Sequence, residues 1–234
     1  MNLLAFDTST DTLSIALAWQ GAGGTRLVEH TAAGGPQAST ALIPAILRLL
    51  AQAGLRLTDL DAIVFGRGPG SFTGLRTACS VAQGLAFGAR LPVLPVDTLL
   101  ALAEEAREQR GATQVVALLD ARMDEVYSAA YSFGDGGWRR HGEFSLGRPE
   151  ALQVPAGWAL AGNAFAAYAE RLPAAASRIA ALPTAAALLR LAPALIAAGQ
   201  AGPAAGALPL YLRDKVAQTT QERAALRAAP AHRL

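Results

Sequence analysis

The sequence predicts an α/β protein made of two halves that repeat one arrangement of strands and helices. Three observations support this fold class. Short apolar runs that end in polar turns alternate with longer segments of helical periodicity. Three strands followed by helices and a further strand occur twice along the 234 residues. A hydrophobic fraction of 52% and a charged fraction of 16% exclude a disordered chain and allow a large buried core.

The first half is expected to begin with a strand and a hairpin. An apolar run that ends in Asp7-Thr8-Ser9 indicates a buried strand before a polar turn, and an alternating segment follows it. Gly54 is a stop signal for the first helix, and Ser71 can cap the second. The expected strands are residues 3–9, 12–19, 25–31, 61–66 and 91–96, and the expected helices are residues 37–53, 71–89 and 98–110.

The same order is expected to restart after Gly111. The run that ends at Asp120 is similar to the first strand with its terminal aspartate, and an alternating segment again follows. The expected strands are residues 114–122, 125–133 and 138–146, and the expected helices are residues 164–171 and 184–198. We therefore expect an N-terminal lobe, residues 1–110, that carries partner-binding helices, and a C-terminal lobe with a tail, residues 111–234.

A glycine-rich loop, GRGPGSFTGLR at residues 66–76, precedes the second long helix and raises the question of a phosphate site. A phosphate-binding P-loop needs a lysine directly after its last glycine, but Gly74 is followed by Leu75 and Arg76. The dinucleotide motif and the nucleophile elbow of hydrolases are absent as well. We interpret the loop as a stiff Gly-Pro-Gly turn that leads into a capped helix.

The two long helices of the first half are apolar on two sides, and the second has no charged residue from Thr77 to Ala89. Such helices must be covered on both sides. Gly84 and Gly88 each cost about 1 kcal/mol relative to alanine, so they indicate a close approach of another backbone. Either the second half of the chain or another protein covers these helices, and we favour a partner. The predicted partner interface consists of Ser39, Leu42, Ile43, Ile46, Leu47, Arg76, Thr77, Ser80, Val81 and Gly84.

Four segments occur in order over nearly the whole chain: FDTST (6–10), GRGPGSFTGLR (66–76), GLAFG (84–88) and PLYLR (209–213). Together they resemble the bacterial TsaB family, which takes part in tRNA threonylcarbamoyladenosine biosynthesis. The resemblance implies a fold like that of actin, sugar kinases and heat-shock ATPases (the ASKHA fold), with two lobes of the β-β-β-α-β-α type. This fold agrees with the repeated pattern of the two halves.

The resemblance also implies a function as a subunit without catalytic activity. TsaB proteins are paralogues of TsaD, the transferase that attaches a threonylcarbamoyl group to the adenosine beside the tRNA anticodon. They bind TsaD as a heterodimer, the small ATPase TsaE joins the pair, and tRNA is contacted indirectly through the complex. Pairing uses two N-terminal helices, here residues 37–53 and 71–89, and free family members can form homodimers through the same surface. The chain is therefore expected to activate or stabilise a TsaD-like transferase and to recruit a TsaE-like ATPase.

The residues themselves offer few groups for catalysis. A metal site like that of the transferase paralogue needs two histidines four residues apart, whereas His30, His141 and His232 are far apart. No metal and no cofactor are therefore predicted. In ATPases of this fold, an aspartate at the end of the first strand organises Mg²⁺ near the phosphates. The predicted vestigial nucleotide cleft consists of Asp7, Thr8, Ser9 and Asp120.

Two other functions stay open as alternatives. One is an ATP-dependent kinase or hydrolase that uses Asp7 and Asp120, against which Asp7-Thr8-Ser9 can be a polar turn whose side chains cap local main-chain N–H groups. The other, less favoured, is a metallopeptidase, for which the H-E-x-x-H motif is missing.

The composition favours a cytoplasmic protein that does not contact membranes. The single cysteine, Cys79, fits a reducing compartment. The first ten residues lack the features of a secretory signal, and no apolar run reaches the roughly 18 residues of a membrane span. The formal net charge is only +2, and we interpret the mildly basic residues 213–233 as a solvated tail.

Overall fold

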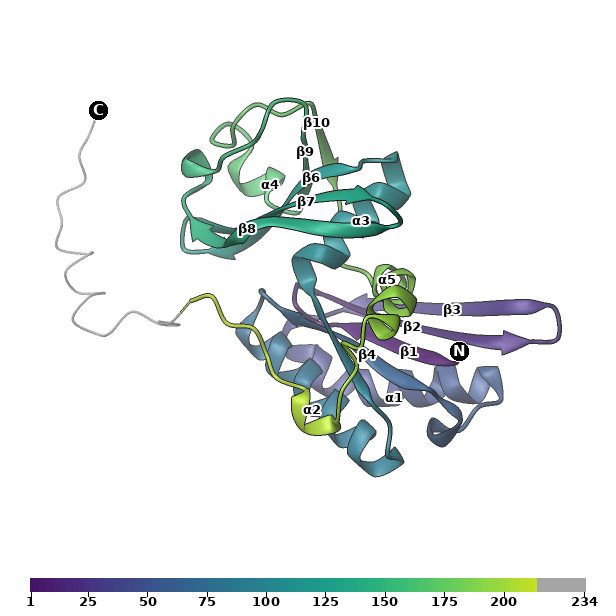
Figure 1. The fold of residues 1–234 in the computed structure, drawn as a ribbon. Coiled ribbons are helices and arrows are strands. Elements are labelled where there is room, and N and C mark those ends of the chain that lie inside the picture. Colours follow the sequence, from purple (N-terminus) through teal and green to yellow (C-terminus); the bar gives the residue numbers. More distant parts are fainter. Residues whose placement is uncertain (214–234) are drawn as a thin grey trace, which may run out of the picture.

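The structure is a computed structural model, and it describes residues 1–213 of the chain. His232 and the basic tail after Arg213 lie outside the described residues. The described residues form two lobes, one above the other in Figure 1, and each lobe is built on a five-stranded sheet.

The first sheet has the strand order β3-β2-β1-β4-β5. Its strands are β1 (Leu3–Asp7), β2 (Thr12–Gly21), β3 (Gly24–Ala33), β4 (Ala62–Gly68) and β5 (Val93–Asp97). The strands β1, β2 and β3 are antiparallel, whereas β4 pairs parallel with β1 and β5 pairs parallel with β4. Every residue of the central strand β1 is buried, as its continuous apolar run predicts for a strand covered on both faces.

The second sheet repeats this arrangement in the order β10-β9-β6-β7-β8. Its strands are β6 (Gln114–Arg122), β7 (Glu125–Gly134), β8 (Gly137–Gly147), β9 (Ala159–Gly162) and β10 (Ser177–Ala180). The predicted α/β fold class is confirmed: both lobes have three antiparallel strands on one side of the sheet and two added parallel strands on the other. One connection differs, because only the short 3₁₀ helix Pro149–Ala151 lies between β8 and β9.

Two long helices, α1 (Ala38–Ala53) and α2 (Phe72–Ala89), cover the lower face of the first sheet in Figure 1, and α5 (Ala185–Ala197) covers its other face. On the second sheet, α3 (Thr98–Arg110) packs on one face and the short α4 (Phe165–Tyr168) on the opposite face. The predicted bounds of the four long helices are confirmed to within one residue, whereas α4 is shorter than predicted. Among residues 1–213, no helix is both long and apolar enough to cross a membrane.

Two of these helices are exchanged between the lobes. The helix α3 lies before residue 111 in the chain but packs on the second sheet, and α5 lies after it but packs on the first sheet. A division into residues 1–110 and 111–234 therefore separates the two sheets but not the helices that cover them. The domain boundary stays a prediction.

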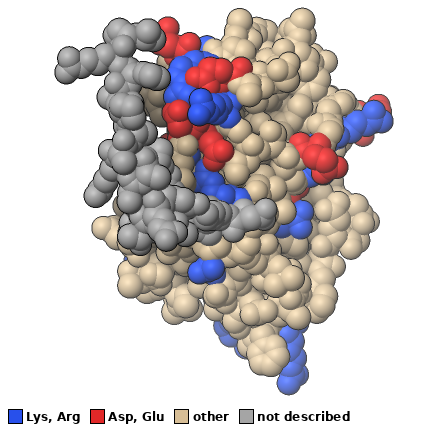
Figure 2. Space-filling view, turned by 90° about the vertical axis from the view of Figure 1, so that its left-hand side faces the viewer, with Lys and Arg blue, Asp and Glu red and all other residues tan. Residues whose placement is uncertain are grey.

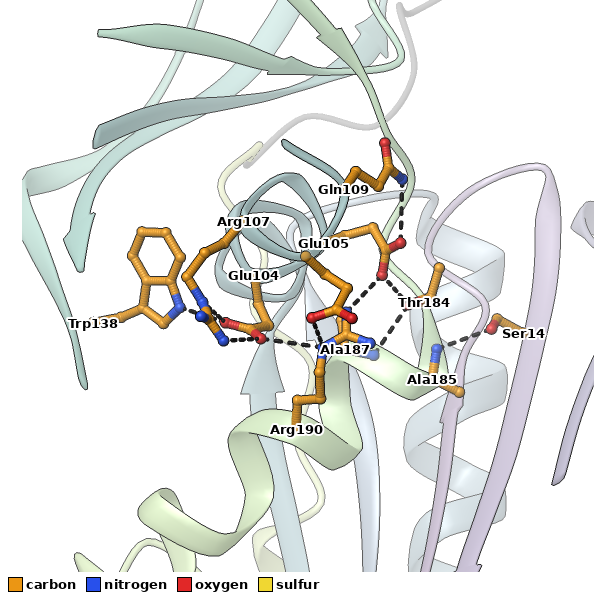
Figure 3. Close-up of polar contacts among 11 residues, drawn as sticks. Ser14, Glu104, Glu105, Arg107, Gln109, Trp138, Thr184, Ala185, Ala187 and Arg190 are labelled. Atoms are coloured by element: carbon orange, nitrogen blue, oxygen red, sulfur yellow. Dashed lines mark hydrogen bonds and ion pairs between the residues drawn. The ribbon is translucent and has the colours of Figure 1, made fainter. Parts of the chain in front are cut away.

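Glu104 of α3 is the buried centre of a partly exposed polar network that joins these two helices (Figure 3). Its side chain accepts hydrogen bonds from Arg107 Nε (3.0 Å) and Nη2 (2.9 Å), and the residue is only 2% exposed. It also accepts hydrogen bonds from Trp138 Nε1 on β8 (2.8 Å) and from Arg190 Nε on α5 (3.1 Å). Burial acts to raise the pKa of Glu104, but the hydrogen bonds from these three side chains and the charge of Arg107 outweigh it, so the pKa lies below its ordinary value.

A second carboxylate, Glu105, extends the network to the start of α5. It accepts hydrogen bonds from Arg190 Nη2 (2.8 Å) and from Thr184 Oγ1 (2.7 Å), the residue that caps α5. The main-chain N of Ala185 donates to Ser14 Oγ on β2 (2.9 Å), as Figure 3 also shows. The amino end of α5 is thus held by polar contacts to both lobes, which braces the lobes against each other.

Candidate functional site

The helices α1 and α2, predicted to bind a partner, each bury one side against the first sheet. The side of α1 that faces the sheet consists of Ala38, Leu42, Ala45, Ile46, Leu49 and Leu50. The prediction that Leu42 and Ile46 contact a partner is therefore wrong, because both are 0% exposed in the core of the first lobe. Both sides of α1 are apolar, so the sequence pattern could not show which side faces the sheet.

The outer side of α1 and α2 carries large apolar side chains that the rest of residues 1–213 leaves exposed. Ile43 is 41% exposed, Leu47 54% and Phe87 81%. Phe87 is not among the sequence-predicted contacts, although its place between Gly84 and Gly88 in an uncharged helix was an available signal. We define the two-helix face as the exposed and half-buried residues Ser39, Ile43, Leu47, Arg76, Thr77, Ser80, Val81, Gly84 and Phe87.

The second lobe does not cover the two-helix face. It lies on the other side of the first sheet, beyond α5 (Figure 1). A Cβ atom added at Gly84 or Gly88 would meet no atom within 4 Å, so both glycines face open space. Within residues 1–213, the second half of the chain packs on α2 through the 3₁₀ helix Ala204–Gly206 and Tyr211, but it leaves Ile43, Leu47 and Phe87 exposed. The alternative that it covers the outer side of both helices is therefore excluded for these residues.

The PLYLR segment passes beside the first turn of α2 and then reaches the second lobe. The Tyr211 ring stacks on Phe72 with ring centroids 4.3 Å apart, and the Tyr211 hydroxyl accepts a hydrogen bond from Arg76 Nε (3.2 Å). Two residues later, Arg213 forms an ion pair with Glu125 of β7. This segment therefore joins the two lobes next to the two-helix face, and Arg76 already has a partner within the chain.

A cleft of about 780 Å³ lies between the lobes, at the amino end of α2. Of the four residues predicted to form a vestigial nucleotide cleft, Ser9 and Asp120 line it. Asp7 and Thr8 do not line it, and they are only 1% and 0% exposed. The structure thus brings half of the predicted set to the cleft and places the other half inside the first lobe.

The carboxylate of Asp7 makes its contacts inside the protein. Its Oδ1 accepts hydrogen bonds from the main-chain N (2.8 Å) and the Oγ (2.6 Å) of Ser9. Its Oδ2 lies against Gly66, where an added Cβ would overlap it. Burial raises the pKa of Asp7 to about 6, and the hydrogen bonds from Ser9 act in the opposite direction. A ligand in the cleft does not reach this carboxylate in the observed conformation.

Asp7→Asn is expected to make the stability of the protein less dependent on pH. The pKa of Asp7 is about 6 in the folded protein and 3.8 ordinarily, so between these values the folded state binds more protons and stability falls as pH rises. The variant should therefore gain about 3 kcal/mol of unfolding free energy relative to wild type between about pH 4 and about pH 7. Urea unfolding followed by circular dichroism measures the unfolding free energy of both proteins. A difference between variant and wild type that does not change over this pH range would contradict a buried carboxylate at Asp7.

The charged side chains around the cleft are paired with one another. Arg122 Nη2 lies 2.6 Å from Asp11 Oδ2, an ion pair between the lobes, and Arg122 Nη1 lies 3.7 Å from Asp120 Oδ2. Arg213 also lines the cleft and pairs with Glu125. Figure 2 shows acidic and basic side chains interspersed on one side of the molecule, with no broad area of a single sign. The cleft therefore lacks the unpaired positive charge that favours a phosphate group.

The described residues offer no cluster for a metal ion and no reactive thiol. Residues 1–213 contain no group of three or more His, Cys, Asp or Glu that could hold a metal ion. His30 lies on β3 of the first sheet and His141 on β8 of the second, so they do not form a pair. Burial raises the pKa of the Cys79 thiol to about 12, which keeps it protonated and unreactive at neutral pH.

Comparison with known proteins identifies the family of this chain. A family model described as TsaD, tRNA N6-adenosine threonylcarbamoyltransferase, matches residues 30–221. The tRNA threonylcarbamoyladenosine biosynthesis protein TsaB of Escherichia coli (strain K12) is 37% identical over 178 residues, which are 72% of this chain and 74% of that protein. The chain belongs to the TsaB family.

Two further proteins support this assignment to the TsaB family. The TsaB protein of Haemophilus influenzae is 47% identical over 129 residues, 54% of this chain and 52% of that protein, so the match spans about half of that relative. The solved structure of YeaZ from Pseudomonas aeruginosa is 42% identical, with a TM-score of 0.82 and coverage of 90% of this chain and 99% of that one. The resemblance to TsaB proteins that the four sequence segments indicated is confirmed.

Proposed function

We propose that this TsaB-family chain is a subunit without catalytic activity that supports threonylcarbamoylation of the adenosine beside the tRNA anticodon. It binds a TsaD-like transferase as a heterodimer through the two-helix face, and it thereby activates or stabilises that enzyme. The observation that carries the proposal is the exposed apolar surface of α1 and α2, on which Phe87 is 81% exposed. Contiguous apolar surface on a soluble protein marks an interaction site.

The two-helix face has the composition of a protein–protein interface. Phe87 is an aromatic side chain of the kind that anchors interfaces, and Ile43 and Leu47 on α1 add exposed apolar area. Gly84 has no side chain and lets a partner helix approach closely. The helices α1 and α2 have 16 and 18 residues and are about 24 and 27 Å long. Two helices of this length can supply the roughly 800 Å² that each partner buries in a stable interface.

The residues of the cleft support a role as a partner subunit over a role as an ATP-dependent enzyme. Asp7, the residue on which that alternative depends, is 1% exposed and bonded to Ser9. Asp120 accepts a hydrogen bond from Tyr168 (3.0 Å) and lies 3.7 Å from Arg122, so it too is engaged within the chain. The proposal therefore assigns the chemistry to the transferase and the recognition to this chain.

The same proposal covers the other partners expected of a TsaB protein. A TsaE-like ATPase is recruited once the heterodimer has formed, and tRNA is reached through the complex. The isolated chain can pair with a second copy through the two-helix face, because that face is apolar and uncovered within residues 1–213. Homodimer and heterodimer then compete for one surface, and the transferase displaces the second copy.

Gly84→Leu is expected to weaken binding of the TsaD-like transferase while the chain stays folded. The new side chain extends into open space in the free protein but into the partner helix in the complex. Isothermal titration of the chain with the TsaD-like transferase of the same organism should show an affinity at least about tenfold lower, which corresponds to about 1.4 kcal/mol.

The matched control for this experiment is Gly84→Ala. It adds a single methyl group and should stabilise the free chain by up to about 1 kcal/mol, because alanine favours a helix over glycine. The thermal midpoint of both variants should therefore equal or exceed that of wild type. Equal affinity of wild type and folded Gly84→Leu for the transferase would contradict the proposed function.

A further inference from the structure

In the ATPases of the fold that the sequence resembles, an aspartate at the end of the first strand organises Mg²⁺ near the phosphates, and the corresponding turn here is residues 7–10. A main-chain carbonyl group of this turn already has a hydrogen-bond partner within the chain. The carbonyl oxygen of Ser9 accepts a hydrogen bond from the main-chain N of Ser71, at a distance of 2.7 Å. A Cβ added at Gly70 would lie 2.6 Å from the same oxygen, so the loop before α2 is packed directly against the turn. A phosphate group does not fit between them.

The next residue toward the core makes an equally close contact with α2. The hydroxyl of Thr8, which is 0% exposed, donates to the carbonyl oxygen of Gly74 in the first turn of α2 (2.7 Å). A Cβ added at Gly74 would overlap the carbonyl oxygen of Thr8, so only glycine permits this approach. The turn therefore holds α2 through Thr8 at Gly74 and through Ser9 at Ser71. Asp7 in turn holds Ser9 with two hydrogen bonds.

We infer that residues 7–9 form a clamp that positions α2 for docking, in place of the phosphate cradle that the resemblance implies. The inference rests on the proposed function of the two-helix face. Because a helix moves as a stiff rod, a small shift of its first turn displaces Arg76, Thr77 and Ser80, which lie within the next two turns. In this assignment Thr8 is a positioning residue: it acts on the partner through α2 and does not touch the partner.

Thr8→Val tests the clamp, because valine keeps the shape of threonine and removes the hydroxyl donor. Binding of the TsaD-like transferase should weaken about tenfold, and amide hydrogen exchange in residues 72–76 of the free chain should become faster. Thr8→Ser retains the donor and should restore binding to within about twofold of wild type. If Thr8→Val does not fold, Thr8→Ala removes the donor without adding a methyl group and replaces it in the experiment.

Two controls separate positioning from a general loss of stability. Thr25→Val removes an exposed hydroxyl, which accepts a hydrogen bond from Gln20 at the β2–β3 hairpin, and should bind like wild type. Val116→Ala destabilises the core of the second lobe and should also bind like wild type at a temperature where it is folded. Weakened binding by Val116→Ala to the same extent as by Thr8→Val would overturn the inference.

The outcomes distinguish the clamp from the docking face itself. Normal binding by Thr8→Val, together with loss of binding by Gly84→Leu, would overturn the clamp and leave the two-helix face supported. Normal binding by folded Gly84→Leu would overturn the two-helix face and the clamp with it. Loss of binding by both, with rescue by Thr8→Ser, is the result that the clamp predicts.

Discussion

Glu104→Gln is expected to lower the free energy of unfolding by about 3 kcal/mol, because it removes the buried carboxylate that pairs with two partly exposed guanidinium groups. The carboxylate is 2% exposed and accepts four hydrogen bonds, two of them from Arg107 and one each from Trp138 and Arg190. Glutamine can donate or accept at this place but cannot compensate the two guanidinium charges. Urea unfolding at neutral pH measures the loss.

The pH dependence of the unfolding free energy tests the role of Glu104 a second time. The pKa of Glu104 is lower in the folded protein than its ordinary value of 4.5, so its contribution to stability is present above that value. The contribution is lost as pH falls through the folded pKa, and the difference between wild type and variant should shrink in acid.

Glu108→Gln is the matched control, since Glu108 is 58% exposed and lies 3.9 Å from Arg190. Glu108→Gln should lower the free energy of unfolding by less than about 1 kcal/mol. If both variants lost the same unfolding free energy, the claim that the network around Glu104 braces the lobes would be contradicted.

Gly66→Ala is expected to destabilise the protein by about 3 kcal/mol, at the upper end of what overpacking costs in a buried site. Gly66 is on β4, next to Asp7 on β1, and an added Cβ would overlap Asp7 Oδ2 and lie 2.8 Å from its Cγ. Asp7 cannot move aside easily, because it is buried and its other oxygen is bonded to Ser9. Chemical unfolding measures the effect, and Gly137→Ala, a strand glycine with open space around it, should be close to neutral.

Removal of the Asp7 carboxylate should restore most of the stability that Gly66→Ala loses. In an Asp7→Ala background the two nearest atoms are gone, and the next contact of the added Cβ is at an ordinary 3.4 Å. Gly66→Ala should then cost less than about 1 kcal/mol, so a double-mutant cycle should give a coupling energy of about 2 kcal/mol or more. Additive effects of the two substitutions would show that the carboxylate does not occupy the space beside Gly66.

Most of the fold could be predicted from local signals in the sequence. Gly54, at a positive φ of 69°, ends α1, and Ser71 caps α2 by accepting a hydrogen bond from Gly74, as the residue types predict. The strands β9 and β10 cannot be predicted individually from the sequence, because they have only four residues each and carry little periodic signal. The exchange of α3 and α5 between the sheets could not be predicted. The sequence pattern shows that each helix has an apolar side, but not which of the two sheets that side packs on.

The candidate site could be predicted only in part, for the same physical reason. Hydrophobic periodicity shows that a helix has an apolar side, but α1 has two, and periodicity alone does not show that the side with Leu42 and Ile46 faces the sheet. On α2, Phe87 has the greatest exposed fraction of the large apolar side chains in residues 1–213, and the sequence-predicted interface omits it. The burial of Asp7 arises from contacts with residues 66–71, a separation that sequence patterns do not reveal.

The central claim is that the outer side of α1 and α2 docks a TsaD-like transferase. Amide hydrogen exchange of the chain, measured alone and with a saturating amount of the transferase from the same organism, tests it most directly. The claim predicts that binding slows exchange in residues 38–53 and 72–89 and leaves the second sheet, residues 114–180, unchanged. Slowed exchange in the second sheet or around the cleft, with α1 and α2 unchanged, would contradict it.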